Sequence, residues 1–134
     1  MLGLCLGVAG SIWAQMPAEQ ITLSWTHTIE KIRWAEDYRI LPNGFILEQA
    51  RVKGSGAGME IPADAVLKNG SWHYQPKLPV LPMLKLGRTP EAGDYQLCVS
   101  SANTEQQCHL MSFWVGEPTA AQPSIELWAC DMQD

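Results

Sequence analysis

The chain has 134 residues, a formal net charge of −5, 46% hydrophobic residues and 17% charged residues. This length and apolar content predict one domain with its own hydrophobic core, and they argue against a disordered chain. The basic residues are scattered without a cluster and are outnumbered by acidic ones, so the composition argues against nucleic acid as a partner.

The first 18 residues are expected to lie outside the folded domain. The run MLGLCLGVAGSIWA has no charged residue, is too short for an ordinary membrane-spanning helix, and fits the apolar part of an export signal. We therefore expect a signal-like segment over residues 1–18 and a periplasmic or otherwise exported protein, with anchoring to the inner membrane as a variant. Because no lysine or arginine precedes the run, an ordinary first strand stays open as an alternative.

Two runs of alternating residues follow and predict a β-hairpin. On one parity, residues 21–29 are large and apolar except for His27, and residues 34–40 repeat the pattern with Glu36 as the exception. Period-two alternation is typical of half-buried strands. His27 and Glu36 are therefore both predicted to point inward.

A turn at residues 31–32 would place His27 opposite Glu36. The same register would set Trp25 opposite Tyr38. Opposed side chains on one face lie about 5 Å apart at Cβ, so an imidazole and a carboxylate there can form a hydrogen bond. Two interpretations stay open: a structural pair in the core, or a site for a small ligand or a metal ion.

A third strand is predicted for FILEQARVK, after a turn at residues 41–44. Depending on where that turn is centred, Gln49 or Arg51 falls opposite Glu36, which would make a small polar cluster in the sheet. The alternation divides the apolar residues of this strand between two faces, Phe45 and Leu47 on one and Ile46, Ala50 and Val52 on the other.

The middle of the chain is rich in glycine and proline. The run GSGAGM does not open a helix and lacks a GK[ST] ending, so it predicts a conformationally demanding loop rather than a phosphate-binding one. Trp72 and Tyr74 share one parity of a short strand. The three prolines that follow confine residues 75–83 to a sheet edge or a loop.

Cysteine spacing predicts one disulfide. Cys98 and Cys108 flank a short polar run inside a predicted hairpin, and a five-residue loop sets them opposite each other. Cys5 lies in the signal-like segment, so Cys130 is left over and is expected to be free or to bond to another chain. A metal site at Cys98, Cys108 and His109 is disfavoured, because no CxxC pair is present.

These elements predict an all-β fold: a single antiparallel β-sandwich or partly open barrel over residues 19–116. Residues 117–134 are expected to form a linker and a C-terminal edge strand or tail. No Ser-His-Asp order, catalytic carboxylate pair or HExxH helix is present, so a binding protein without metal or cofactor is favoured over an enzyme. The alternative is a metal-binding, small-ligand or hydrolytic site built on His27 and Glu36.

The chain carries W-x-H-[ST]-x-E followed by W-x-E-x-Y, and later GAGM, NGSWHY and GDYQLC. Together these motifs resemble the bacterial domain of unknown function 1850 family over most of the chain. The matching positions are His27, Thr28, Glu30, Trp34, Glu36, Tyr38, Gly56, Ala57 and Gly58.

Members of that family look like small exported proteins often encoded beside TAXI-type TRAP transporter components. The resemblance therefore implies an accessory role in solute uptake, with a transporter or other membrane protein as partner and a small molecule as ligand. It carries over no established activity. The expected ligand-binding residues are His27, Glu30, Glu36, Tyr38, Gly56 and Gly58.

Overall fold

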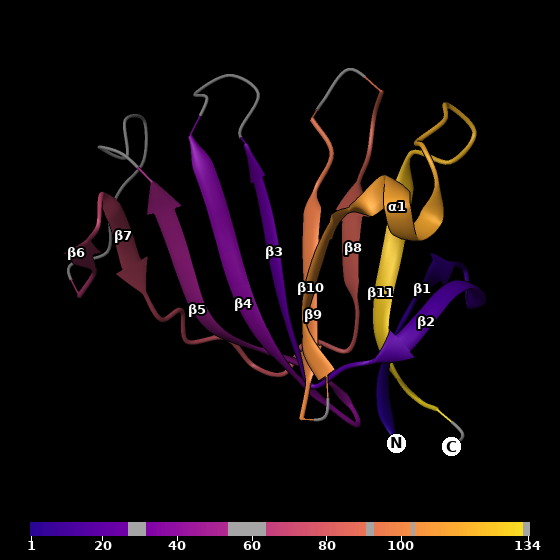
Figure 1. Ribbon diagram of the computed structural model, residues 1–134, viewed down its shortest axis with the longest axis horizontal. Coiled ribbons are helices and arrows are strands. Elements are labelled where there is room, and N and C mark those ends of the chain that lie inside the picture. Colours follow the sequence, from indigo (N-terminus) through magenta and orange to yellow (C-terminus); the bar gives the residue numbers. More distant parts are fainter. Residues whose placement is uncertain (27–31, 54–63, 91–92, 103, 133–134) are drawn as a thin grey trace.

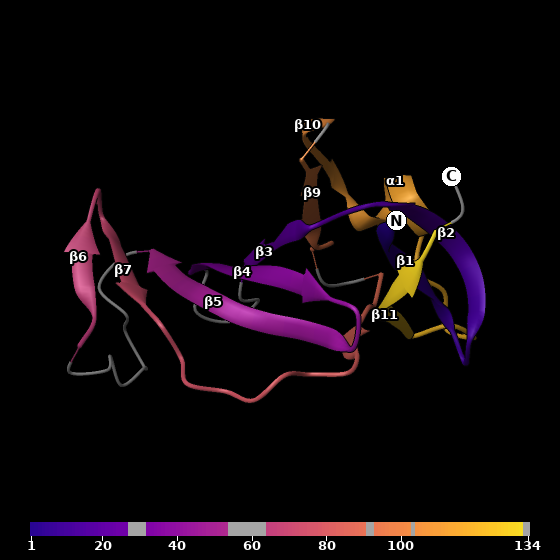
Figure 2. The same ribbon diagram turned by 90° about the horizontal axis from the view of Figure 1, so that it is seen from below.

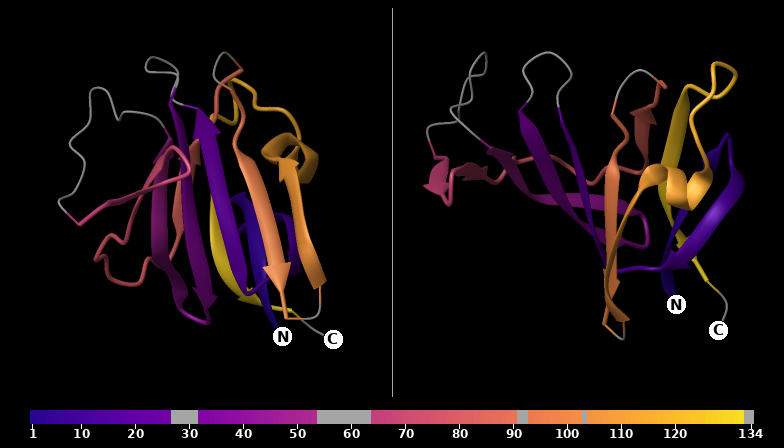
Figure 3. Two further views of the ribbon diagram at one scale, coloured as in Figure 1. Left: turned by 60° about the vertical axis from the view of Figure 1, so that its left-hand side comes forward. Right: turned by 45° about the horizontal axis from the view of Figure 1, so that its top comes forward.

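Antiparallel strands make up nearly all of the regular structure (Figure 1). The computed structural model describes residues 1–26, 32–53, 64–90, 93–102 and 104–132. Two sheets pack together around a shared core, with the smaller sheet toward one end of the larger one (Figures 2 and 3). The predicted all-β sandwich is confirmed.

The larger sheet has seven strands in the order β10-β9-β3-β4-β5-β7-β6. Its strands are β3 (Gln20–Thr26), β4 (Arg33–Leu41), β5 (Gly44–Lys53), β6 (Val66–Lys68), β7 (Ser71–Tyr74), β9 (Gln96–Ser101) and β10 (Thr104–Leu110). The smaller sheet has four strands in the order β2-β1-β11-β8. Its strands are β1 (Leu2–Val8), β2 (Ser11–Pro17), β8 (Leu84–Gly87) and β11 (Ser124–Asp131), and a short helix α1 (Met111–Val115) follows β10.

The hydrophobic core lies between the two sheets. We call the side of the seven-stranded sheet that faces the core its inner face, and the opposite side its outer face. The largest fully buried core side chains come from both sheets and from α1, which contributes Met111; those from the sheets are Leu4, Leu6, Leu23, Phe45, Leu97, Ile125 and Leu127. Burial of each large apolar side chain contributes about 1.5–3 kcal/mol, which makes this layer the main source of stability.

The seven-stranded sheet extends beyond the smaller one. Figure 2 shows β6 and β7 at the end of the sheet far from β1, β2 and β11. The segment at residues 75–83 runs from β7 across to β8, and Phe45 and Leu81 exchange backbone hydrogen bonds of 2.8 and 2.9 Å on the way. Leu81 therefore pairs with the start of β5 before the chain enters β8.

The N-terminal segment belongs to the fold, contrary to the expectation that residues 1–18 lie outside it. β1 pairs with β2 on one side and β11 on the other, and Leu4 and Leu6 are fully buried. The apolar run is explained by this position, because β1 is a central strand buried on both faces from Gly3 to Gly7, and such strands are apolar along their length. The first-strand alternative fits the structure.

The C-terminal segment also differs from its expected role. β11 is an internal strand, paired with β1 and β8, rather than an edge strand or a tail. Cys130 on β11 forms a disulfide with Cys5 on β1, so the prediction of a leftover Cys130 is wrong. The predicted bridge between Cys98 and Cys108 is confirmed.

The hairpin of β3 and β4 is present, but its predicted register is wrong. Trp25 lies opposite Trp34 and Leu23 lies opposite Glu36, whereas the predicted register sets Trp25 opposite Tyr38. The two registers differ by four positions, an even number, so the same residues face inward in both. Alternation therefore fixes the face of each residue without choosing between these registers.

A β-bulge in β5 overturns the predicted division of its apolar residues. Leu47 lies opposite Tyr38 while Gln49 lies opposite Asp37, which leaves Glu48 as an extra residue. An inserted residue shifts the alternation by one, so residues on both sides of it reach the same face. The inner face consequently receives four buried residues, Phe45, Leu47, Ala50 and Val52.

Candidate functional site

The inner face of the extended part of the sheet carries a carboxylate among aromatic side chains. Across the strands, Glu36 of β4 has Leu23 of β3 on one side and Ala50 of β5 on the other. Ala50 in turn lies opposite Tyr74 of β7. The prediction that Gln49 or Arg51 lies opposite Glu36 is therefore wrong, because Ala50 occupies that position on β5.

Tyr38 is the hydrogen-bond partner of Glu36 within the same strand. Two residues apart on a strand, the side chains share a face, and the Tyr38 hydroxyl donates to Glu36 Oε1 at 3.0 Å. Burial raises the pKa of the Glu36 carboxyl above its ordinary value, and the hydrogen bond from Tyr38 opposes that rise. The hydrogen bond from Tyr38 thus replaces only part of the hydration that the Glu36 carboxylate loses on burial.

Two further tyrosines, Tyr74 on β7 and Tyr95 just before β9, lie close enough to this carboxylate for its charge to affect them. Burial raises the pKa of Tyr74 and that of Tyr95, and the negative charge of Glu36 adds to the rise in both. The pKa of Tyr38 is raised for the same two reasons and by its hydrogen bond to Glu36. All three phenols are therefore kept protonated at neutral pH, so each is available as a hydrogen-bond donor.

A row of aromatic rings adjoins the carboxylate on the same face. Trp25 and Trp34 stack with ring centroids 6.2 Å apart, and Tyr95 lies against Trp25 at 5.5 Å. Val52 lies opposite Trp34 and has Trp72 on its other side, so the row continues across β5 to β7. The indoles and phenols share this face with Ala50 and Val52, both of which are buried.

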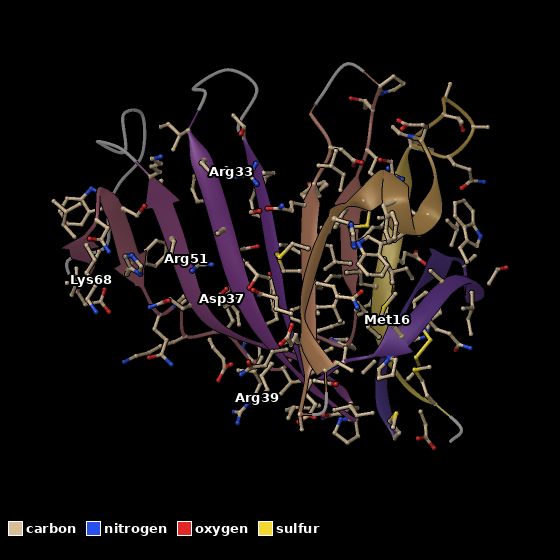
Figure 4. The ribbon with its side chains drawn as sticks, in the orientation of Figure 1. Met16, Arg33, Asp37, Arg39, Arg51 and Lys68 are labelled. Carbon is tan, nitrogen blue, oxygen red and sulfur yellow. A yellow bond between two sulfur atoms is a disulfide. The ribbon has the colours of Figure 1, made fainter. Side chains whose placement is uncertain are left out.

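The sheet also carries a second carboxylate, Asp37, which differs from Glu36 by being neutralised. Asp37 lies on the outer face, where its Oδ1 accepts hydrogen bonds from Arg51 at 2.8 Å and Thr22 at 2.6 Å. Figure 4 shows Asp37 and Arg51 on the neighbouring strands β4 and β5. Among the residues that the structure describes, no lysine or arginine forms an ion pair with Glu36.

A hollow of about 280 Å³ lies beside Asp37 on the outer face. Its walls are polar, and they include Thr22, Gln49 and Glu48. Because Asp37 is already paired with Arg51 and Thr22, this hollow offers a ligand less unsatisfied charge than the inner face does. We therefore take the inner face as the candidate site.

The structure brings together two of the six predicted ligand-binding residues, Glu36 and Tyr38. The other four, His27, Glu30, Gly56 and Gly58, lie outside the described residues, and so does the predicted pairing of His27 with Glu36.

Tyr74 and Tyr95 were missed as neighbours of Glu36. Tyr74 is brought to Glu36 by the pairing of β5 with β7, and Tyr95 by the pairing of β3 with β9, over long sequence separations. The shared parity of Trp72 and Tyr74 was the only signal in the sequence that pointed to this side of the site.

In the described ranges, no group of three or more His, Cys, Asp or Glu side chains is arranged to hold a metal ion. The same ranges contain no helix with the length and apolar character needed to cross a membrane.

The fold and the site define a disulfide-bonded β-sandwich with a carboxylate on an aromatic face. A family model described as Domain of unknown function (DUF1850) matches residues 21–105, and the chain belongs to this family. The match covers β3, β4 and the aromatic rows beside them. No curated protein and no solved structure matches the chain.

Replacing Glu36 by glutamine is expected to stabilise the folded protein near neutral pH. A carboxyl whose pKa is raised by folding stabilises the fold below its ordinary pKa, and this contribution is lost as pH rises through the folded-state pKa. Glutamine keeps an acceptor for Tyr38 without the buried charge. The melting temperature of Glu36→Gln should therefore exceed that of wild type at neutral pH and approach it below the ordinary pKa.

Glu48→Gln is the matched control for this measurement. It removes the same charge from an adjacent strand, but Glu48 lies on the outer face in an exposed pair with Arg39. The control should leave the melting temperature nearly unchanged. A lower melting temperature for Glu36→Gln at neutral pH would instead indicate that the Glu36 carboxylate is a structural element of the core.

Proposed function

We propose that this chain is an exported, non-enzymatic binding module that takes a small solute on the inner face around Glu36 and serves a TRAP-type transporter as an accessory. The observation that carries the proposal is a partly buried carboxylate that has phenols around it and no cationic partner among the described residues. Such a charge costs free energy in the folded state, and a bound ligand can offset that cost.

The disulfides support the exported location. All four cysteines are paired, in the bridges Cys5–Cys130 and Cys98–Cys108. Disulfides form and persist in oxidising compartments such as the periplasm and are rare in the cytosol. The transporter association is supported by the family resemblance of the W-x-H-[ST]-x-E and W-x-E-x-Y motifs.

Two experiments test the proposal. Tagged protein isolated from membranes of its own organism should co-purify the transporter. Protein purified from the native host should also release a small molecule on denaturation, detected by mass spectrometry, in an amount close to that of the protein, whereas Glu36→Gln should release much less. Isolation of the intact transporter without the tagged chain, together with no released molecule, would contradict the proposal.

A further inference from the structure

The inner-face site has the chemistry of a receptor for positive charge. Its one ionised side chain in the described residues is Glu36, and its other polar groups are the hydroxyls of Tyr38, Tyr74 and Tyr95. The arginines of the adjoining strands are used elsewhere: Arg51 pairs with Asp37, and Arg33 donates to Ser24 Oγ at 2.7 Å on the outer face. Within the described ranges, no cationic side chain therefore compensates the negative charge of the site from either face.

The aromatic rings favour the same kind of ligand. The face of an indole or phenol ring carries negative electrostatic potential and attracts an organic cation within about 6 Å, most strongly where water is excluded. Trp25, Trp34 and Tyr95 form one continuous aromatic group, and Trp72 and Tyr74 stand on the far side of β5. A cation beside Glu36 thus meets a carboxylate and ring faces together.

One strand separates the Glu36 carboxylate from the Tyr74 phenol. Glu36 and Tyr74 lie on β4 and β7, with β5 between them, so their backbones are about 10 Å apart at about 4.8 Å per strand. The residue between them is Ala50, the side chain of which is a single methyl group. A bulkier residue at this position would bring its own side chain between the carboxylate and the phenol.

From these observations we propose that the site binds an organic cation, with an ammonium or guanidinium group against the Glu36 carboxylate and its apolar part against the rings of Trp34, Tyr74 and Tyr95. This inference rests on the proposed binding function and adds the chemical class of the ligand. It assigns no reaction, because charge pairing and ring contacts require no bond to form or break.

The test compares cations with neutral molecules of the same shape. Choline and 3,3-dimethylbutan-1-ol differ mainly in charge, and so do arginine and citrulline. Binding to the oxidised full chain is measured by tryptophan fluorescence and by calorimetry. At least one of the two cations should bind with a dissociation constant below about 1 mM, and its neutral counterpart should bind at least about tenfold more weakly.

Variants locate the binding. Glu36→Gln should weaken the binding of that cation by about tenfold or more, while Glu48→Gln, with the same change of charge on the outer face, should stay within about twofold of wild type. Tyr74→Leu should weaken it as well, and circular dichroism shows whether each variant is folded. If Tyr74→Leu fails to fold, Tyr38→Phe, which removes only the hydroxyl that touches Glu36, takes its place.

The outcomes separate this inference from the proposed function. Equal binding of a cation and its neutral counterpart, or unchanged binding in Glu36→Gln, would overturn the organic-cation assignment. Failure of both choline and arginine to bind would overturn it too. After any of these three results, a neutral or acidic solute released from protein purified from the native host would still support the proposed binding function.

Discussion

Replacing Cys5 and Cys130 together by alanine is expected to lower the free energy of unfolding by about 5 kcal/mol. The two cysteines are 125 residues apart in sequence, so their bridge closes nearly the whole chain into one loop. In the chain-entropy description, the stabilisation grows with the logarithm of loop length and reaches about 5 kcal/mol for loops of this size. Urea unfolding of the double variant, followed by tryptophan fluorescence, measures the loss.

The second disulfide supplies the control. Cys98 and Cys108 are only 10 residues apart, and the same description gives their bridge about 3 kcal/mol. The double alanine variant of this pair should therefore be the more stable of the two. An equal or larger loss for the Cys98 and Cys108 variant would contradict the assignment of the long loop as the dominant constraint.

The position of the long-range bridge explains why its loss should be felt across the sandwich. Cys5 is fully buried on β1, and Cys130 lies on β11; these are the two central strands of the smaller sheet. Figure 3 shows the first and last strands side by side. Without the bridge, the pairing of β1 with β11 must close the same loop by hydrogen bonds and side-chain packing alone.

Replacing Arg88 by methionine is expected to cost about 3–5 kcal/mol of stability. The Arg88 side chain is only 4% exposed, and it donates to both carboxylate oxygens of Asp94 at 3.3 Å and to the Gly116 carbonyl at 2.9 Å. Removing one partner of a buried ion pair leaves the other charge uncompensated, which is the source of the loss. Urea unfolding with both disulfides intact measures it.

The effect of Arg88 should extend to the candidate site. Asp94 also accepts hydrogen bonds from the backbone amides of Tyr95 at 3.0 Å and Ser112 at 2.7 Å. Tyr95 is the residue whose ring lies against Trp25. An altered Asp94 carboxylate is therefore expected to displace the ring that closes the aromatic row, and the near-ultraviolet circular dichroism of Arg88→Met should change.

Arg39→Met is the matched control for this prediction. Arg39 pairs with Glu48 at 3.7 Å on the surface, where the two side chains are 52% and 37% exposed. Exposed pairs contribute about 0–1 kcal/mol, because water screens the charges and the side chains lose freedom. If Arg88→Met were no more destabilising than Arg39→Met, the Arg88–Asp94 pair would have no special role in stability.

The alternation of apolar and polar residues predicts only part of the site around Glu36. The period-two pattern predicted that Glu36 points inward, and it correctly put Trp25 and Trp34 on the same face. It gave the wrong partner across the hairpin, because an even shift of register leaves every inward residue inward. Tertiary contact selects the register in which the two indoles stack.

The bulge at Glu48 had no signal in the sequence. Without it, Ala50 and Val52 would face away from Phe45 and Leu47, and no small residue would separate Glu36 from Tyr74. The position of a bulge is set by the registers in which the strand pairs with its neighbours, and those neighbouring strands lie elsewhere in the chain.

The sequence by itself determined the all-β class, the inward face of Glu36 and the Cys98–Cys108 bridge. These depend on alternation and short spacings, which are local properties of the chain. Only the tertiary structure decided that the first residues form a core strand, that Cys5 reaches Cys130, and that Tyr74 and Tyr95 surround Glu36. The physical reason is that strand order and register come from contacts between distant segments, whose burial is shared and cannot be read from either segment alone.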